Sequence, residues 1–165
     1  MEIWDAYDEN FNIIEGVTLV RGEEETIPEG VYHLVVDILV KHKDGTYLLM
    51  QRDPNKSNGS MWEASGGGSA LKGENAYTAA LRELKEETGI VAEKLKEVGR
   101  VVRPETKSVY VVFVCETDCD KDSIVLQEGE TVAYDWVDRD TLISMDPGKL
   151  LTYRVQTFLE ELRLH

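Results

Sequence analysis

The stretch GSALKGENAYTAALRELKEETGI, Gly68–Ile90, decides most of what the sequence predicts. Its second part has helical spacing and predicts an α-helix from about residue 75 to residue 88. Asn75 is a residue type that caps helix N-termini, and Gly89 stands where helices commonly end in a left-handed residue. The sequence therefore gives this helix a defined start and a defined end.

Three glutamates share one side of the predicted helix. At about 100° per residue, Glu83, Glu86 and Glu87 fall within an arc about 100° wide. They repel one another without a cation, and Arg82 can hold Glu86 by a charge-assisted hydrogen bond. Hard oxygen ligands grouped in this way suit Mg²⁺ or Mn²⁺, which share their coordination with substrate phosphates. The arc indicates a phosphoryl-transfer site; the alternative interpretation is a solvated acidic face.

The other residues of the helix predict which side is buried. Ala76 and Ala79 lie on the glutamate side, so that side is expected to be sterically open. Tyr77, Leu81 and Leu84 lie together on another side and are expected to form the buried stripe.

Written as spacings, the stretch is one glycine, five residues, a glutamate, seven residues and then REL-K-EE-T-GI. This pattern resembles, at every specified position, the signature of the Nudix hydrolases, a family that cleaves nucleoside diphosphates linked to another moiety. The resemblance implies an α/β fold, an α/β/α sandwich with a mixed β-sheet, here preceded by an N-terminal β-hairpin. It also implies a pyrophosphohydrolase with Mg²⁺ or Mn²⁺ as cofactor.

The resemblance also implies roles for individual residues. Glu83 or Glu86 would activate the attacking water, while Glu74 and Arg82 would orient the ligating glutamates. Bound cations would lower the pKa of water and neutralise charge on the bridging phosphates. The implied metal ligands are Gly68, through its carbonyl, and Glu83, Glu86 and Glu87.

A second segment resembles one Nudix branch, that of the isopentenyl diphosphate isomerases and related hydrolases. Residues 51–56 and 61–63 carry the matching arginine, lysine and tryptophan. Arg52 and Lys56 are therefore candidate contacts for substrate phosphate, with an exposed basic loop as the alternative. Trp62 is a candidate for stacking on a base, with a core position as the alternative.

Departures from the isomerase pattern favour hydrolysis. Isomerases carry a catalytic cysteine near the position of Gly67, a ligating histidine near Ser69 and an acidic pair near residues 106–108. None of these is present here. An isomerase-like protein and a non-catalytic nucleotide sensor are the alternative functions.

Other candidates have weaker signals. Glu128 and Glu130 resemble the loop that gives many Nudix enzymes a further glutamate as ligand or base; the alternative is an acidic loop. His33 matches an isomerase ligand by position but lacks its companion histidine, which favours a packed or hydrogen-bonded role. Tyr7 and Tyr32 are candidates for base stacking or for the core.

The rest of the 165-residue chain predicts one domain, residues 1–165, of which residues 1–30 form a hairpin and an acidic loop. Residues 33–40 read as a buried central strand, because they form a nearly continuous apolar run. The further expected elements are a hairpin at 2–15, extended to 21, a strand at 47–52, a loop from 53 to 68, strands at 96–102, 108–115 and 132–137, and a helical tail at 146–164.

Composition limits the partners. The net charge of −14 repels phosphate backbones, so a nucleic acid polymer is not expected, and a small diphosphate needs a cation to offset the repulsion. No apolar run is long enough to span a membrane, and the N-terminus lacks signal-peptide features. Two cysteines suit a reducing compartment, so we expect a cytoplasmic protein. The leaving portion of the substrate, the number of metal ions and the oligomeric state, with a homodimer as one option, stay open.

Overall fold

The structure is a computed structural model that describes residues 1–151, 155, 157–160 and 162. Its strands confirm the predicted hairpin and the strands expected around residues 33–52, 96–117 and 131–137. The elements in chain order are β1 (Ile3–Tyr7), β2 (Ile13–Val20), a 3-10 turn (Glu24–Thr26), β3 (His33–His42), β4 (Tyr47–Arg52), β5 (Trp62–Glu63), β6 (Gly66–Ser69), α1 (Ala76–Thr88), β7 (Lys96–Arg103), a second 3-10 turn (Pro104–Thr106), β8 (Ser108–Thr117), β9 (Thr131–Val137) and α2 (Arg139–Ser144).

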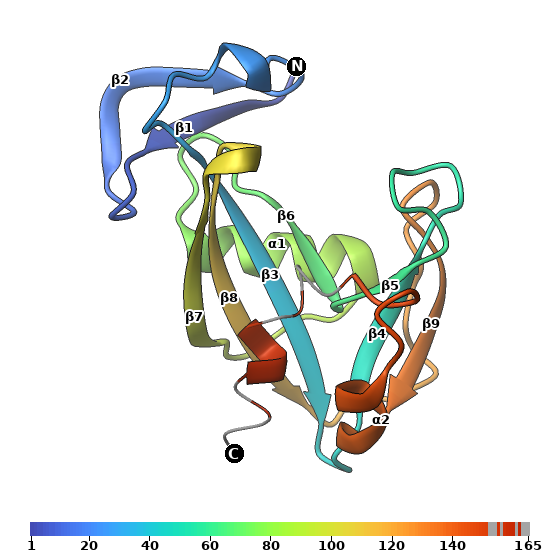
Figure 1. Ribbon diagram of the computed structural model, residues 1–165. Helices are drawn as coiled ribbons and strands as arrows, with labels where there is room; N and C mark the ends of the chain where they lie inside the picture. The colour runs from blue at the N-terminus through green and yellow to red at the C-terminus, as the bar shows by residue number, and fades with distance from the viewer. Residues whose placement is uncertain (152–154, 156, 161, 163–165) are drawn as a thin grey trace.

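Among the described residues, seven strands form one mixed sheet with the order β5-β4-β3-β8-β7, to which β6 and β9 add through β3 and β4. β3 and β8 run parallel in unbroken register from His33 opposite Ser108 to His42 opposite Thr117. The remaining pairs are antiparallel. β1 and β2 form a separate antiparallel hairpin at one end of the molecule (Figure 1). The mixed sheet and the N-terminal hairpin are as predicted.

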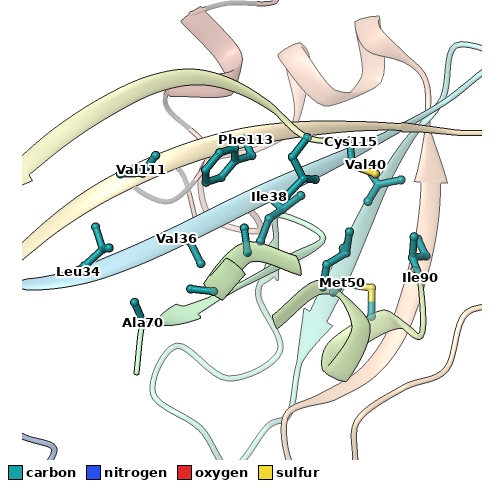
Figure 2. Packing of buried hydrophobic residues seen from close by; sticks show 14 of the residues in the cluster. Leu34, Val36, Ile38, Val40, Met50, Ala70, Ile90, Val111, Phe113 and Cys115 are labelled. Atoms are coloured by element: carbon teal, nitrogen blue, oxygen red, sulfur yellow. The ribbon is translucent and has the colours of Figure 1, made fainter. Parts of the chain in front are cut away.

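The sheet has an apolar core on each face. Alternate residues of β3 point to the face covered by α1, because successive side chains of a strand lie on opposite sides. Figure 2 shows Leu34, Val36, Ile38 and Val40 of β3 beside Val111 and Phe113 of β8 in this first core. Leu39 belongs to the second core, with side chains of α2 and the C-terminal segment. Helical segments on both faces give the predicted α/β/α layers.

The sheet divides along one edge of β3. β6 pairs with residues 35–38 of β3, and β4 pairs with Val40 and Lys41 farther along the same edge. β4 and β6 therefore diverge from a common strand, as the arrows in Figure 1 show. The prediction of a loop from 53 to 68 was wrong for β5 and β6. The triple glycine favoured a loop, but residues 66–69 pair with β3.

The C-terminal segment differs in part from the predicted tail helix. Residues 146–149 form a turn, in which the Asp146 carboxylate accepts a hydrogen bond from the amide of Gly148 at 2.8 Å. Pro147 and Gly148 favour this turn over helix, so the prediction was wrong there. Val155, residues 157–160 and Leu162 are helical, and the other residues of the predicted tail lie outside the described ones. α2, capped by Asp138, was not predicted.

The hairpin has a small core of its own, in which Trp4, Ala6, Leu19 and Ile27 are buried together. It joins the rest of the molecule at Tyr7 and Tyr32, which exchange backbone hydrogen bonds and belong to the first core of the sheet. No helix in the described part of the chain is long and apolar enough to cross a membrane.

Candidate active site

Helix α1 is fixed at both ends by its own sequence. The Asn75 side chain accepts a hydrogen bond from the Thr78 amide at 2.8 Å, and the Thr78 hydroxyl accepts one from the Asn75 amide at 3.1 Å. Gly89 has a φ of 80°, the left-handed conformation that ends the helix. The predicted start and end of the helix are confirmed.

The glutamate side of α1 is open only in part. Ala79 is 0% exposed and Glu83 is 9% exposed against the sheet, whereas the Glu86 side chain is 48% exposed. Of the expected buried stripe, Leu84 is 0% exposed as predicted, but Tyr77 is 39% exposed. The reason for the burial of Glu83 lies in β6, since a Cβ on Gly68 would lie 2.4 Å from the Oε1 atom of Glu83. Small residues on both elements let the helix lie against the strand and place a carboxylate in that space.

One guanidinium organises the carboxylates of this region. Arg82 binds Glu74 through two hydrogen bonds, of 2.7 Å from Nε and 2.9 Å from Nη2. Its Nη1 atom lies 3.0 Å from Oε1 of Glu83 and 3.2 Å from Oε2 of Glu86. Nη2 also donates to the Ser69 carbonyl at 3.2 Å. The arginine thus joins the helix, the strand before it and the connecting loop.

Burial and pairing shift two of these groups in opposite directions. Desolvation raises the pKa of the Glu83 carboxyl to about 7, although the neighbouring Arg82 opposes the shift. Burial would also raise the pKa of Glu74, but hydrogen bonds from Arg82 and from the Leu71 amide outweigh it and lower that pKa. Glu74 is therefore a fixed anion, whereas Glu83 is a carboxylate held in an environment that disfavours its charge.

The donor set suits a hard divalent cation. Glu83, Glu86 and Glu87 offer only oxygen, and the backbone of Gly68 adjoins Glu83. Glu87 accepts a hydrogen bond from the Gly67 amide at 3.2 Å. Within residues 1–151 and the few described beyond them, no three acidic, histidine or cysteine side chains converge closely enough to hold a metal. The carboxylates are held apart by Arg82 and the β6 backbone, so ligation would need them to turn toward one cation.

These groups line a cleft of about 460 Å³. α1 and β6 form one wall, the segments around β4, β5 and the start of β9 form the other, and the N-terminal hairpin with the start of β3 closes one end. Of the predicted site residues, those that line the cleft are Arg52, Lys56, Gly68, Arg82, Glu83, Glu86, Glu87 and Glu130, together with His33.

The cations of the second wall are paired. Arg52 is 8% exposed, and its guanidinium lies 2.9 Å from the Glu63 carboxylate and donates to the Ser57 carbonyl at 2.9 Å. Lys56 forms an ion pair with Glu130 across the cleft rim. Contact of Arg52 and Lys56 with phosphate therefore stays a prediction, as does a role for Glu130 as ligand or base.

Other predicted residues lie away from the cleft lining. Trp62 packs against the second core and forms a backbone bridge with Leu150. Tyr7 and Tyr32 are buried in the first core. The described residues that line the cleft do not include these three, Glu74 or Glu128. The roles given to Trp62 and Glu128 stay untested predictions.

The structure adds residues that sequence reasoning missed. Trp4, Ser108 and Thr131 line the cleft and are buried. Within the described part of the chain, the Trp4 indole nitrogen and the Thr131 hydroxyl have no hydrogen-bond partner. Each residue reads as an ordinary strand position, so no local signal would have found it.

Comparisons with known proteins identify the family of the chain. A family model described as NUDIX domain matches residues 31–155. An uncharacterized Nudix hydrolase of Listeria monocytogenes is 39% identical over 92 residues, 55% of this chain and 53% of that protein. One of Listeria innocua is 40% identical over 91 residues, 54% of this chain and 52% of that protein. The chain thus spans about half the length of the curated relatives it matches.

Solved structures share the fold. DR0079 from Deinococcus radiodurans has a TM-score of 0.72 and 18% identity, covering 99% of this chain and 98% of that chain. A MutT protein from Methanosarcina mazei has a TM-score of 0.67 and 25% identity, covering 84% and 96%. The NUDIX domain of Shewanella oneidensis NrtR, complexed with ADP ribose, has a TM-score of 0.64 and 18% identity, covering 89% and 100%. Because the family model matches most of the chain and the signature glutamates line the cleft, the chain belongs to the NUDIX domain family.

Proposed function

We propose that this chain is a Mg²⁺-dependent pyrophosphohydrolase that cleaves the diphosphate linkage of a small nucleoside-diphosphate-type compound. The observation that carries the proposal is the position of Glu83, Glu86 and Glu87 along one wall of a cleft whose other wall holds Arg52 and Lys56. Acidic groups for a cation and basic groups for phosphate are thus present in one space.

The metal would be held by the glutamates of α1 with the Gly68 carbonyl. Mg²⁺ or Mn²⁺ bound there supplies charge neutralisation for the diphosphate and a lowered pKa for water. Arg82 would keep Glu83 and Glu86 in position, because it contacts both at 3.0 and 3.2 Å. Glu74 fixes Arg82 in turn, which makes both of them positioning residues.

Hydrolysis needs a group to take a proton from the attacking water. Glu86 suits this role, because its side chain is 48% exposed and Arg82 engages its Oε2 atom. The water oxygen bonds to phosphorus, the bond to the bridging oxygen breaks, and the proton passes to the carboxylate. Glu83 and Glu130 are the other candidates for this base.

The isomerase alternative is not favoured. Gly67 and Ser69 occupy the positions where isomerases have a cysteine and a histidine, and both residues line the cleft. The curated relatives are named Nudix hydrolases. No observation favours a second function.

The test is a substrate screen with matched variants. The purified protein is incubated with nucleotide sugars, dinucleotides, oxidised nucleoside triphosphates and prenyl diphosphates, with Mg²⁺ or Mn²⁺, and phosphate-containing products are measured. Turnover of at least one compound that needs the cation and is lost in Glu86→Gln supports the proposal. Absence of turnover on every compound, together with no Mg²⁺ uptake in calorimetry, would overturn it.

A further inference from the structure

We propose that the hairpin end of the cleft is a subsite for the uncharged, hydroxyl-bearing part of the substrate, where Trp4 donates a hydrogen bond and Ser69 accepts one. His33 positions both residues. The inference rests on the proposed function, because it assigns an orientation to the same diphosphate compound. It would place the phosphates toward the glutamates and the sugar portion toward the hairpin.

The contacts of His33 fix its tautomer. Its Nε2 atom lies 2.9 Å from the Ser108 hydroxyl, and that hydroxyl also lies 2.9 Å from the Thr106 carbonyl. A carbonyl only accepts, so the single hydroxyl proton of Ser108 goes to Thr106. Nε2 must then carry the proton of the ring and donate it to Ser108.

The other ring nitrogen sets the direction of Ser69. With Nε2 protonated, Nδ1 of the neutral ring has a lone pair, and the Ser69 hydroxyl lies 3.3 Å from it. Burial of His33, which is 7% exposed, lowers its pKa to about 4, so the ring is neutral at physiological pH. The Ser69 proton therefore points to His33, and its oxygen is left to accept a hydrogen bond within the cleft.

Trp4 supplies the matching donor. Its ring stacks on His33 with centroids 4.2 Å apart and an interplanar angle of 13°. The side chain is 2% exposed, and Nε1 has no hydrogen-bond partner among the described residues. A buried indole donor without a partner is unfavourable, and Trp4 lines the cleft, so an acceptor of a ligand that displaces the atoms covering Nε1 would be favoured there. Because His33 covers a face of the ring, we assign Trp4 a hydrogen bond with the ligand rather than stacking.

The charges around this end disfavour phosphate. Glu2 and Glu24 line the cleft here and act electrostatically on His33. Arg21, the cation of the hairpin lining, is held by Glu2 at 2.8 Å. A donor and an acceptor beside carboxylates suit sugar hydroxyls, which both donate and accept and carry no charge.

The tautomer can be tested without activity. Nitrogen-15 NMR of the imidazole distinguishes a protonated Nε2 from a protonated Nδ1. We expect His33 of the wild-type protein to be the neutral Nε2–H form at pH 7. The Nδ1–H tautomer would direct the Ser69 hydroxyl differently and would overturn the proposal.

The subsite is tested with two substitutions and a control. Trp4→Phe leaves a smaller aromatic ring that can still stack on His33 and removes the N–H, and Ser69→Ala removes the acceptor oxygen. For the best compound of the screen, each should raise KM roughly 3- to 10-fold with little change in kcat. Binding of inorganic pyrophosphate should be unchanged. Tyr7→Phe, a buried change in the same hairpin away from the cleft lining, should alter neither the KM for the compound nor the binding of pyrophosphate.

The outcomes separate this inference from the proposed function. If no compound is hydrolysed and no Mg²⁺ is taken up, the proposed function fails. Calorimetry with ADP-ribose and Mg²⁺ still tests the subsite, because each cleft variant should raise the Kd for ADP-ribose by the factor expected above for KM. Equal affinity of wild type and Ser69→Ala for ADP-ribose, or no binding by the wild type, would overturn the subsite. If Trp4→Phe does not fold, Ser69→Ala carries the test alone.

Discussion

The two walls of the cleft are built in different ways. The α1–β6 wall comes from one continuous segment, residues 66–88, and a single arginine serves three carboxylates. The opposite wall and the hairpin end come from distant segments, and their cations are paired one to one, as in Arg21–Glu2, Arg52–Glu63 and Lys56–Glu130. The comparison indicates that reaction class is encoded locally, whereas choice of substrate depends on tertiary assembly.

The largest expected effect removes a carboxylate from the α1 wall. Glu86→Gln or Glu87→Gln deletes a charge with almost no change in volume, so the fold should survive. We expect kcat to fall by on the order of 100-fold or more, measured as product release with Mg²⁺. Glu93→Gln, the same change at an exposed position outside the cleft, should have wild-type kcat. Normal turnover by both cleft variants would show that the wall is only an acidic surface.

A conservative change at the shared cation is next. Arg82→Lys keeps the charge but loses the fork that binds Glu74 twice and also reaches Glu83 and Glu86. We expect roughly a 10- to 100-fold loss of activity, with a weaker apparent affinity for Mg²⁺. The matched change Arg100→Lys loses an exposed two-point contact with Glu97 and should be silent. Equal behaviour of the two variants would contradict a positioning role.

The buried carboxylate predicts a pH effect on stability. The pKa of Glu83 is about 7 in the folded protein, above its ordinary value of 4.5. The folded state therefore binds this proton more tightly than the unfolded state. The contribution of protonated Glu83 to the free energy of unfolding is complete at low pH and is lost as pH rises through 7. In EDTA, Glu83→Gln should therefore be more stable than wild type at pH 8.5, by about 2 kcal/mol, and the difference should shrink at pH 5. Urea unfolding at both pH values measures it. A difference that does not depend on pH would refute the assignment.

Strand β6 offers a matched pair of glycines. A Cβ on Gly68 would lie 2.4 Å from the Glu83 carboxylate, whereas one on Gly66 would have its nearest contact at 3.5 Å. Gly68→Ala should displace Glu83 and lower activity roughly 10-fold. Gly66→Ala should change activity much less. Similar losses from both alanines would mean that the strand, and not the carboxylate, is disturbed.

The smallest effect concerns the second wall. Lys56→Gln should raise KM roughly 3- to 10-fold, less so at high salt, because a partly exposed charge is screened. Glu130→Gln separates two roles for its carboxylate. A fall in kcat marks a ligand or base, whereas an unchanged kcat with altered KM marks only a partner of Lys56.

The sequence predicted what short-range rules determine. Asn75 and Gly89 fixed the ends of α1, and the apolar run of β3 fixed the centre of the sheet. β6 was missed because the reason for its glycines is a contact with α1, which no local pattern shows. The burial of Glu83 was missed for the same reason. The turn at Pro147 and Gly148 was missed because apolar spacing was given more weight than turn chemistry.

Within the site, the same division holds. The chain brings the glutamates together by helical spacing, so they could be named from the sequence. The proximity of Lys56 to Glu130, and of Trp4 to His33, depends on how β4, β9 and the hairpin are placed. The residue types at those positions do not indicate which residues they contact.

The parallel pairing of β3 with β8 has a consequence for the order of folding. It joins His33 to Ser108, 75 positions apart in the chain, so a long loop must close before this ladder gains any stability. α1 and β6 are neighbours in sequence and can associate sooner. We expect pulse-labelled hydrogen exchange during refolding to protect α1 amides before those of β3 and β8. A nascent chain would then acquire its acidic wall first, and its ability to discriminate among ligands last.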